Sequence, residues 1–208
     1  STALLGVVRK KGLAILPWSP HLRQWRARVM LLHDVAVESG EDVRWPDLSD
    51  EALLANLEDW LLPYLGQVRR LEDFQQLDLK AILHSRLPWP LPLDLERLAP
   101  ERMAVPSGSV LAIDYSENPP VLAVKLQEMF GCEESPSVAD GKVAILLHLL
   151  SPAQRPLQVT ADLASFWRNG YQEVKREMRG RYPKHPWPDD PLQAVATRHT
   201  KRRLAGEN

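Results

Sequence analysis

The first part of the chain repeats its apolar residues with the period of an amphipathic helix. The clearest apolar positions recur at spacings of three and four residues: Leu22, Trp25, Val29 and Leu32. This spacing predicts one apolar stripe on a helix, with Trp25 buried beneath it. Ser19 and Pro20 stand just before the stripe, as an N-cap serine and a proline at the first helical position. Gly40 is the residue type expected where the helix ends.

Two further helical stretches follow in the sequence. Ser49 predicts the start of the second, with Leu48 and Leu53 spaced to form a hydrophobic staple around it. Pro63 interrupts this helix because proline lacks a backbone donor. The third stretch covers residues 71–84 and again carries apolar residues at helical spacing.

The pattern changes at a proline-rich segment between Leu87 and Pro92. Three prolines in six residues favour extended backbone, so we place a domain boundary near residues 85–100. The predicted domains are a helical connector or accessory part over residues 1–90 and a C-terminal domain over residues 91–208.

The sequence of the second domain predicts strands followed by a helix. Short β-branched runs bounded by turn residues predict strands at 110–115, 121–126 and 143–149. Thr160 is the predicted cap of a final helix, in which Gly170 marks a close packing contact or a kink. The prolines after Tyr182 predict an extended tail. The fold class is therefore α+β: a helical part, then a small β-rich domain with a C-terminal helix and an extended, Pro-rich, basic tail.

Composition excludes several classes of protein. The 208 residues include one cysteine, so no disulfide can form within the chain, and this cysteine usage fits a reducing compartment such as the cytoplasm. Unbroken apolar runs such as 143–147 are far shorter than the roughly 20 residues of a membrane span. The chain starts without methionine or a basic leader, as expected of a cut fragment rather than a targeting signal.

Charge is segregated along the chain although the net charge is only −1. Residues 1–28 hold six basic and no acidic side chains, residues 34–101 hold fifteen acidic against six basic, and residues 161–208 hold ten basic against six acidic. Basic ends indicate an anionic partner. The same pattern is equally compatible with basic ends that fold back onto the acidic middle.

Motifs for catalysis are missing. The letters Asp50-Glu51-Ala52-Leu53 resemble a helicase acidic box, but they open an amphipathic helix, where acids favour the helix dipole. The sequence contains no glycine-rich phosphate cradle with lysine, and its six histidines are scattered without metal-ligand spacing. Cys132 has no neighbouring base and is expected to be a packed residue. We therefore expect no catalytic, cofactor-binding or metal-binding residues.

One chemical signal remains, in the basic and aromatic C-terminal part. Its candidate nucleic-acid-binding residues are Arg168, Lys175, Arg176, Arg179, Arg181, Lys184, Lys201, Arg202 and Arg203. Among them lie four rings: Trp167, Tyr171, Tyr182 and Trp187. Cations that meet phosphate and rings that stack on bases suit single-stranded nucleic acid. The alternative is that the rings form the core and the charges a solvated helix face.

Four strings resemble the C-terminal region of HrpB-type bacterial DExH-box helicases: residues 12–18, 121–131, 149–160 and 179–191. The most specific is Arg-Tyr-Pro-Lys-His-Pro-Trp-Pro at 181–188. The resemblance implies two motor domains upstream, which bind ATP and magnesium, and an ATP-dependent, RNA-directed parent protein in the cytoplasm. This chain would then be a non-catalytic accessory module that assists nucleic-acid binding or positions the motor. Its implied partners are the upstream helicase core and single-stranded nucleic acid, RNA favoured, with no membrane.

A second function stays open, that of a protein–protein interaction module. The acidic helices, or the strings Pro88-Trp89-Pro90 and Pro186-Trp187-Pro188, would dock a partner, because proline-rich segments are preordered ligands for aromatic grooves. The competing interpretation is that each Pro-Trp string is held against its own domain.

Overall fold

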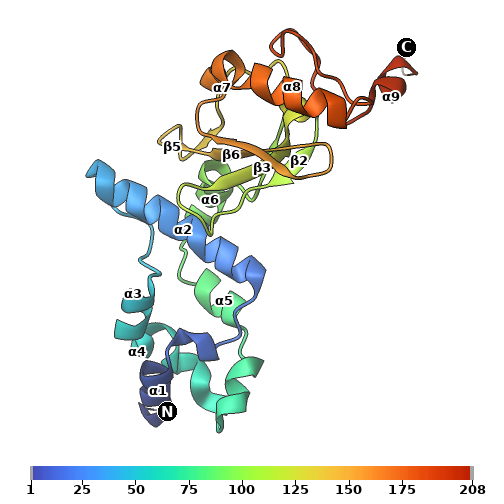
Figure 1. Ribbon diagram of the computed structural model, residues 1–208. Helices are drawn as coiled ribbons and strands as arrows, with labels where there is room; N and C mark the ends of the chain where they lie inside the picture. Colours follow the sequence, from blue (N-terminus) through green and yellow to red (C-terminus); the bar gives the residue numbers. More distant parts are fainter. Residues whose placement is uncertain (1, 207–208) are drawn as a thin grey trace. The chain divides into compact units, whose positions relative to one another are not determined.

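The computed structural model describes residues 2–206, which form two compact units, Ser1–Ala99 and Pro100–Asn208. Within the described residues all strands lie in the second unit, whereas the first is helical (Figure 1). The predicted α+β class is confirmed.

The first unit consists of short helices around one long helix. In chain order they are α1 (Thr2–Lys11), η1 (Leu13–Ile15), α2 (Pro20–Ser39), α3 (Asp50–Ala55), α4 (Leu57–Trp60), η2 (Leu62–Gln67), η3 (Leu71–Gln76), α5 (Leu79–His84) and α6 (Leu91–Leu98), where η marks a 3-10 helix.

The long helix α2 begins and ends as the sequence predicts. The Ser19 hydroxyl accepts a hydrogen bond from the Leu22 amide at 3.0 Å, and Gly40 adopts the left-handed conformation at the C-terminal end. Trp25 is buried, with its ring stacked on the imidazole of His84 at a centroid distance of 4.2 Å. These predictions are confirmed.

The second and third helical stretches are more broken than predicted. Ser49 caps α3, but the Asn56 side chain donates to the Ala52 carbonyl at 2.8 Å and the helix ends there. Residues 71–84 divide into η3 and α5, because the carboxylate of Asp78 accepts from the Ala81 amide and starts a new helix.

Ion pairs connect the basic N-terminal segment to the acidic residues of the same unit. The pairs, with their N–O distances, are Arg9–Glu58 at 2.7 Å, Arg26–Asp50 at 2.5 Å and Arg28–Glu96 at 2.7 Å. Arg28 is 1% exposed, and its Nε also donates to the Ala99 carbonyl at 2.6 Å. In this unit, folding back of basic residues onto acidic ones accounts for half of the N-terminal basic side chains.

The boundary between the compact units lies within the predicted region of residues 85–100, but later than the domain limit drawn at residue 90. Helix α6 belongs to the first unit, which ends at Ala99, so the predicted boundary after residue 90 is displaced. The reason is that Pro92 stands in the first turn of α6, where a proline needs no backbone donor and does not interrupt the helix.

The second unit combines small sheets with helices. Its elements are β1 (Arg102–Ala104), β2 (Val110–Ala112), β3 (Val121–Lys125), η4 (Leu126–Met129), β4 (Ser137–Val138), β5 (Val143–Ala144), β6 (Leu146–Leu150), β7 (Pro156–Thr160), α7 (Leu163–Asn169), α8 (Tyr171–Arg181) and α9 (Lys201–Ala205).

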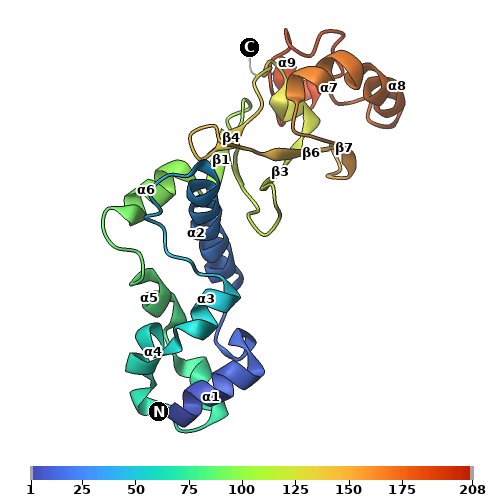
Figure 2. The same cartoon turned by 90° about the vertical axis from the view of Figure 1, so that its left-hand side faces the viewer.

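The central sheet has the strand order β3-β6-β7, with β3 parallel to β6 and β6 antiparallel to β7. The segment after β2 adjoins β3 through an antiparallel bridge between Asp114 and Val121. Side chains alternate between the two faces of the sheet. One face is fully buried at Leu122, Leu147 and Leu149, and α7 and α8 lie on one side of this sheet (Figures 1 and 2).

All three predicted strands contain β-structure, but β1, β4 and β7 were missed. Thr160 ends β7 instead of capping a helix, and the carboxylate of Asp162 caps α7. Gly170 separates α7 from α8, where an added Cβ would lie 2.9 Å from the Phe166 ring. Gly170 therefore marks both a helix break and a close contact.

The predicted extended tail is only partly correct. Residues 182–200 contain no helix or strand, but Pro191 and Thr197 within them are buried against the second unit. Residues 201–205 form the short helix α9 rather than extended backbone. No helix among residues 2–206 has the length and apolar character needed to cross a membrane.

Replacing Arg28 by alanine should destabilise the first unit by roughly 2–5 kcal/mol, because it leaves a cavity in place of a fully buried side chain and takes away the donor of the Ala99 carbonyl. Glu96→Gln is the matched control and should cost less than about 1 kcal/mol, because Glu96 is largely exposed. Urea unfolding measures both. A loss below about 1 kcal/mol for Arg28→Ala would show that the pair is not structural.

Stability should fall as the pH drops below about 6.5. Burial, together with the nearby Lys80, lowers the pKa of His84 from its usual 6.5. The unfolded chain binds this proton more readily than the folded protein does. The contribution of His84 to the free energy of unfolding is therefore complete above pH 6.5 and is lost on acidification. His84→Phe keeps a ring on Trp25 without titrating. Its unfolding free energy, compared with that of the unsubstituted chain from pH 7 to 5, should show a shallower dependence; identical curves would contradict the assignment.

Candidate nucleic-acid interface

Residues 182–200, here called the C-terminal strap, are tied to the second unit by the buried side chain of Gln127. Its Nε2 donates to the carbonyls of Thr197 at 2.7 Å and His199 at 3.1 Å. Its Oε1 lies 3.1 Å from Nδ1 of His185. An amide oxygen only accepts, so this His185 nitrogen carries the proton. One side chain thus holds the strap near both of its ends.

The middle of the strap is held by two further contacts. The Tyr171 hydroxyl donates to the Pro188 carbonyl at 2.7 Å, and the Gly131 amide donates to the Pro191 carbonyl at 2.8 Å. Gly131 has φ 78°, and a Cβ there would lie 3.2 Å from the Ala194 carbonyl oxygen. The close approach of the strap therefore requires glycine at this position.

The strap brings basic residues together that are distant in the sequence. The Lys201 amide donates to the Lys184 carbonyl at 2.9 Å, so the start of α9 lies against the beginning of the strap. The resulting set, here called the basic tail surface, consists of Lys184, Arg198, Lys201, Arg202 and Arg203, all exposed. Arg198 was missed by the sequence analysis. Its signal was its position three residues before the predicted basic residues Lys201, Arg202 and Arg203.

Four other candidates are exposed on the helices. Arg168 lies on α7, whereas Arg176, Arg179 and Arg181 lie on α8. Because Gly170 divides the two helices, Arg168 does not continue the helical spacing of the α8 arginines. The four residues are exposed as expected, but they do not share the face of one continuous helix.

Lys175, a candidate phosphate contact in the sequence, is not exposed to solvent. Its side chain is buried, and its Nζ forms an ion pair with the carboxylate of Asp189. The hydrogen bond and the charge of Lys175 hold the pKa of Asp189 below its usual value. Lys175 therefore anchors the strap to α8, and we remove it from the candidate contacts to phosphate.

The remaining basic candidates differ from Arg9, Arg26 and Arg28 of the first unit in their pairing. Among residues 2–206, no carboxylate forms an ion pair with any of the exposed candidates: Arg168, Arg176, Arg179, Arg181, Lys184, Arg198, Lys201, Arg202 and Arg203. The C-terminal basic excess is thus not consumed by folding back onto acidic residues.

The aromatic residues support the alternative interpretation of the sequence. Trp167, Tyr171 and Phe130 are buried and pack against one another at centroid distances of 5.6 to 6.2 Å. Trp187 is also buried, and its Nε1 donates to the Tyr182 carbonyl at 2.9 Å. Buried rings cannot stack on bases, so these side chains form the core of the unit.

The residues considered for catalysis, Asp50, Glu51 and Cys132, take part in local structure. Asp50 and Glu51 lie in the first turn of α3, as predicted. The Cys132 thiol donates to the Glu134 carbonyl, and burial raises its pKa, which makes the thiol less reactive. The part of the chain that the structure describes contains no group of three histidine, cysteine or acidic residues that could hold a metal ion.

Comparison with known proteins identifies similar sequences. A family model described as ATP-dependent helicase C-terminal matches residues 60–191, more than half of the chain. The chain is 46% identical over 201 residues to the ATP-dependent RNA helicase HrpB of Escherichia coli strain K12, covering 96% of this chain and 24% of that protein.

Two solved structures of HrpB are also similar to this chain. A crystal structure of the E. coli DExH-box NTPase HrpB matches 94% of this chain and 24% of its own, with 46% identity and a TM-score of 0.82. A crystal structure of the E. coli DEAH/RHA helicase HrpB matches 88% and 23%, with 44% identity and a TM-score of 0.68. The chain therefore spans about a quarter of the length of these relatives.

Replacing Gln127 by leucine should loosen the strap. The carbonyls of Thr197 and His199 lose their donor, and an unsatisfied buried group costs about 1–3 kcal/mol. Hydrogen exchange should accelerate in residues 182–200 and remain slow in β3 and β6. Gln193→Leu, at an exposed strap position, is the matched control. Unchanged exchange in the strap would show that Gln127 does not hold it.

Proposed function

Because this chain belongs to the HrpB-type family of ATP-dependent helicase C-terminal regions, we propose that it is an accessory module that holds single-stranded RNA for a motor elsewhere in a longer protein. In this proposal the motor binds ATP and magnesium and performs the hydrolysis, whereas residues 2–206 contribute binding without a catalytic step. The helicase core of the same protein is its partner.

The observation that carries the proposal is the contrast in charge pairing between three arginines of the first unit and the nine exposed candidates of the second. Arg9, Arg26 and Arg28 have carboxylate partners in the first unit. The nine exposed candidates of the second unit have none among residues 2–206. Cations that lack a protein partner are available to phosphate, and binding of phosphate releases counterions from the nucleic acid.

The buried rings determine how this surface would bind. With Trp167, Tyr171 and Trp187 in the core, contacts at the basic tail surface are made to phosphate rather than by stacking. Phosphate contacts position a strand but carry no sequence information. The basic tail surface should therefore bind RNA strands of different sequence alike.

Substitution of Lys201, Arg202 and Arg203 by glutamine should weaken binding of the 208-residue chain to a labelled single-stranded RNA. The log–log slope of affinity against salt should become less steep by up to about 2, at roughly 0.7 per phosphate contact. Fluorescence anisotropy over a salt series measures both quantities.

The control for this experiment removes the same charge from the first unit. Lys10, Lys11 and Lys80 are exposed, and their replacement by glutamine should leave affinity and slope nearly unchanged. An equal effect of both triple substitutions would show that only net charge matters. Absence of RNA binding at low salt would reject the proposal.

A second function is supported by one exposed ring. The Trp89 side chain is 74% exposed, and Leu93 on α6 is also exposed. Of the two Pro-Trp strings, the one at Trp187 is held against its own unit, whereas Trp89 is not. A protein that docks on Trp89 is therefore the alternative, and it becomes the favoured function if the RNA experiment fails.

A further inference from the structure

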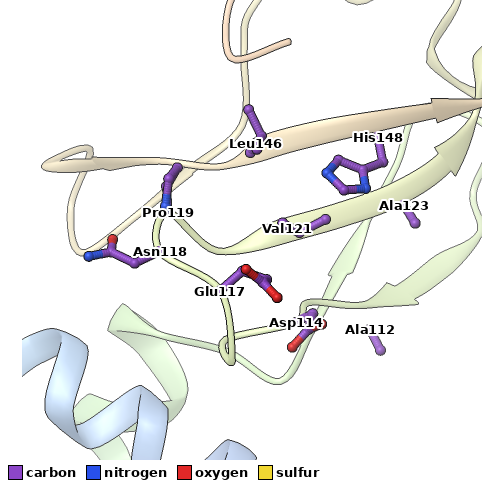
Figure 3. Close-up of a pocket in the computed structure, with 9 residues that line it drawn as sticks. All are labelled: Ala112, Asp114, Glu117, Asn118, Pro119, Val121, Ala123, Leu146 and His148. Carbon is purple, nitrogen blue, oxygen red and sulfur yellow. The ribbon is translucent and has the colours of Figure 1, made fainter. Parts of the chain in front are cut away.

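A hollow of about 380 Å³ lies on one face of the sheet in the second unit (Figure 3). Its floor is formed by the small apolar side chains of Val121 and Ala123 on β3. Asp114 and Glu117 border it on one side and His148 of β6 on the other, as Figure 3 shows. The hollow uses residues of β3 and β6 opposite to the buried Leu122 and Leu147.

The strand register explains why the hollow exists. Asp114 is bridged to Val121, and Ala123 is paired with His148, so the acidic side and the imidazole flank β3 on neighbouring strands. Neighbouring strands are about 4.8 Å apart and two residues along a strand span about 7 Å, which separates the two flanks by roughly 12 Å. Ala123 leaves the space between them unfilled. This slot has an apolar floor and the width to admit a planar ring.

The polar groups of the hollow determine which hydrogen-bonding groups a planar ligand must carry. The Asp114 carboxylate is oriented by hydrogen bonds from the Ser116 amide at 2.9 Å and the Ser116 hydroxyl at 2.6 Å. The Glu117 carboxylate has no hydrogen bond to any residue that the structure describes. Ionised carboxylates only accept hydrogen bonds, and they repel phosphate. The matching ligand is a planar ring with N–H donors on its edge and its phosphates outside the hollow.

The hollow is connected to the strap by β3 itself. Val121, Ala123 and Lys125 alternate onto the same face, so this face leads from the hollow to Lys125. Lys125 stands two residues before Gln127, whose side chain contacts His185, the neighbour of Lys184 on the basic tail surface.

We propose that this hollow, formed by Asp114, Glu117, Ala123 and His148, is a subsite for one base of a single-stranded RNA and selects guanine. This inference rests on the proposed function. Guanine presents two adjacent N–H donor groups on its pairing edge, which match the two oxygens of one carboxylate. Uracil presents one N–H between two carbonyls, and the carboxylates repel those oxygens.

The test compares two short RNAs with the 208-residue chain, one of uridines only and one with a single central guanosine. At one fixed low salt concentration, the guanosine-containing RNA should bind at least about fivefold more tightly, as expected for one bidentate base contact. Glu117→Gln and Ala123→Leu should each reduce this preference to less than about twofold. Binding of the uridine RNA should change little, because the basic tail surface is intact.

Two further substitutions serve as matched controls. Glu133→Gln removes an exposed carboxylate outside the hollow and should preserve the preference for guanosine. The triple substitution of Lys201, Arg202 and Arg203 should weaken both RNAs by the same factor. Circular dichroism of each variant verifies that the unit is folded.

The outcomes separate this inference from the proposed function. Equal binding of both RNAs overturns the base subsite and leaves the proposed function standing. A guanosine preference that survives both Glu117→Gln and Ala123→Leu also overturns it, because the recognition then lies elsewhere. Binding of arginine amide that depends on Glu117, without any base preference, would assign the hollow to a protein side chain instead. If neither RNA binds, the proposed function itself fails.

Discussion

The buried amide of Gln127 is the contact on which the strap and the basic tail surface depend. A glutamine side chain offers an acceptor and two donor hydrogens, and here it binds Thr197, His199 and His185 at once. These groups belong to a segment without helix or strand, whose carbonyls would otherwise lack a partner away from water. The amide therefore determines where the strap lies, and with it the position of Lys184 and Lys201.

The two units use basic residues in opposite ways. In the first, Arg28 is buried and its charge is matched by Glu96, so the cation is part of the structure. In the second, Lys175 is the residue used in this manner, and its pairing with Asp189 fastens the strap. The nine other candidate residues of the second unit remain exposed. A division between structural and available cations cannot be seen from net charge, because both kinds contribute equally to it.

The sheet adds selectivity between bases, which the basic tail surface lacks. Phosphate contacts hold any strand, whereas the hollow beside Ala123 has a shape and an arrangement of acceptors that distinguish one ring from another. The hollow lies on β3 and β6, whereas the basic tail surface lies on the strap and α9. Affinity and selectivity would thus come from different parts of one small unit.

Local interactions are what the sequence alone determined. Ser19, Pro20 and Gly40 define α2 because caps act within a few residues of themselves, and the resemblance in residues 181–188 identified the family. The tertiary structure decided which charges are buried and which strands pair. Lys175 looked exposed until Asp189, fourteen residues later, was found beside it, and the hollow exists only because β3 pairs with β6 in one register. Pairing between distant segments depends on the packing of the whole unit, and no short stretch of sequence contains that information.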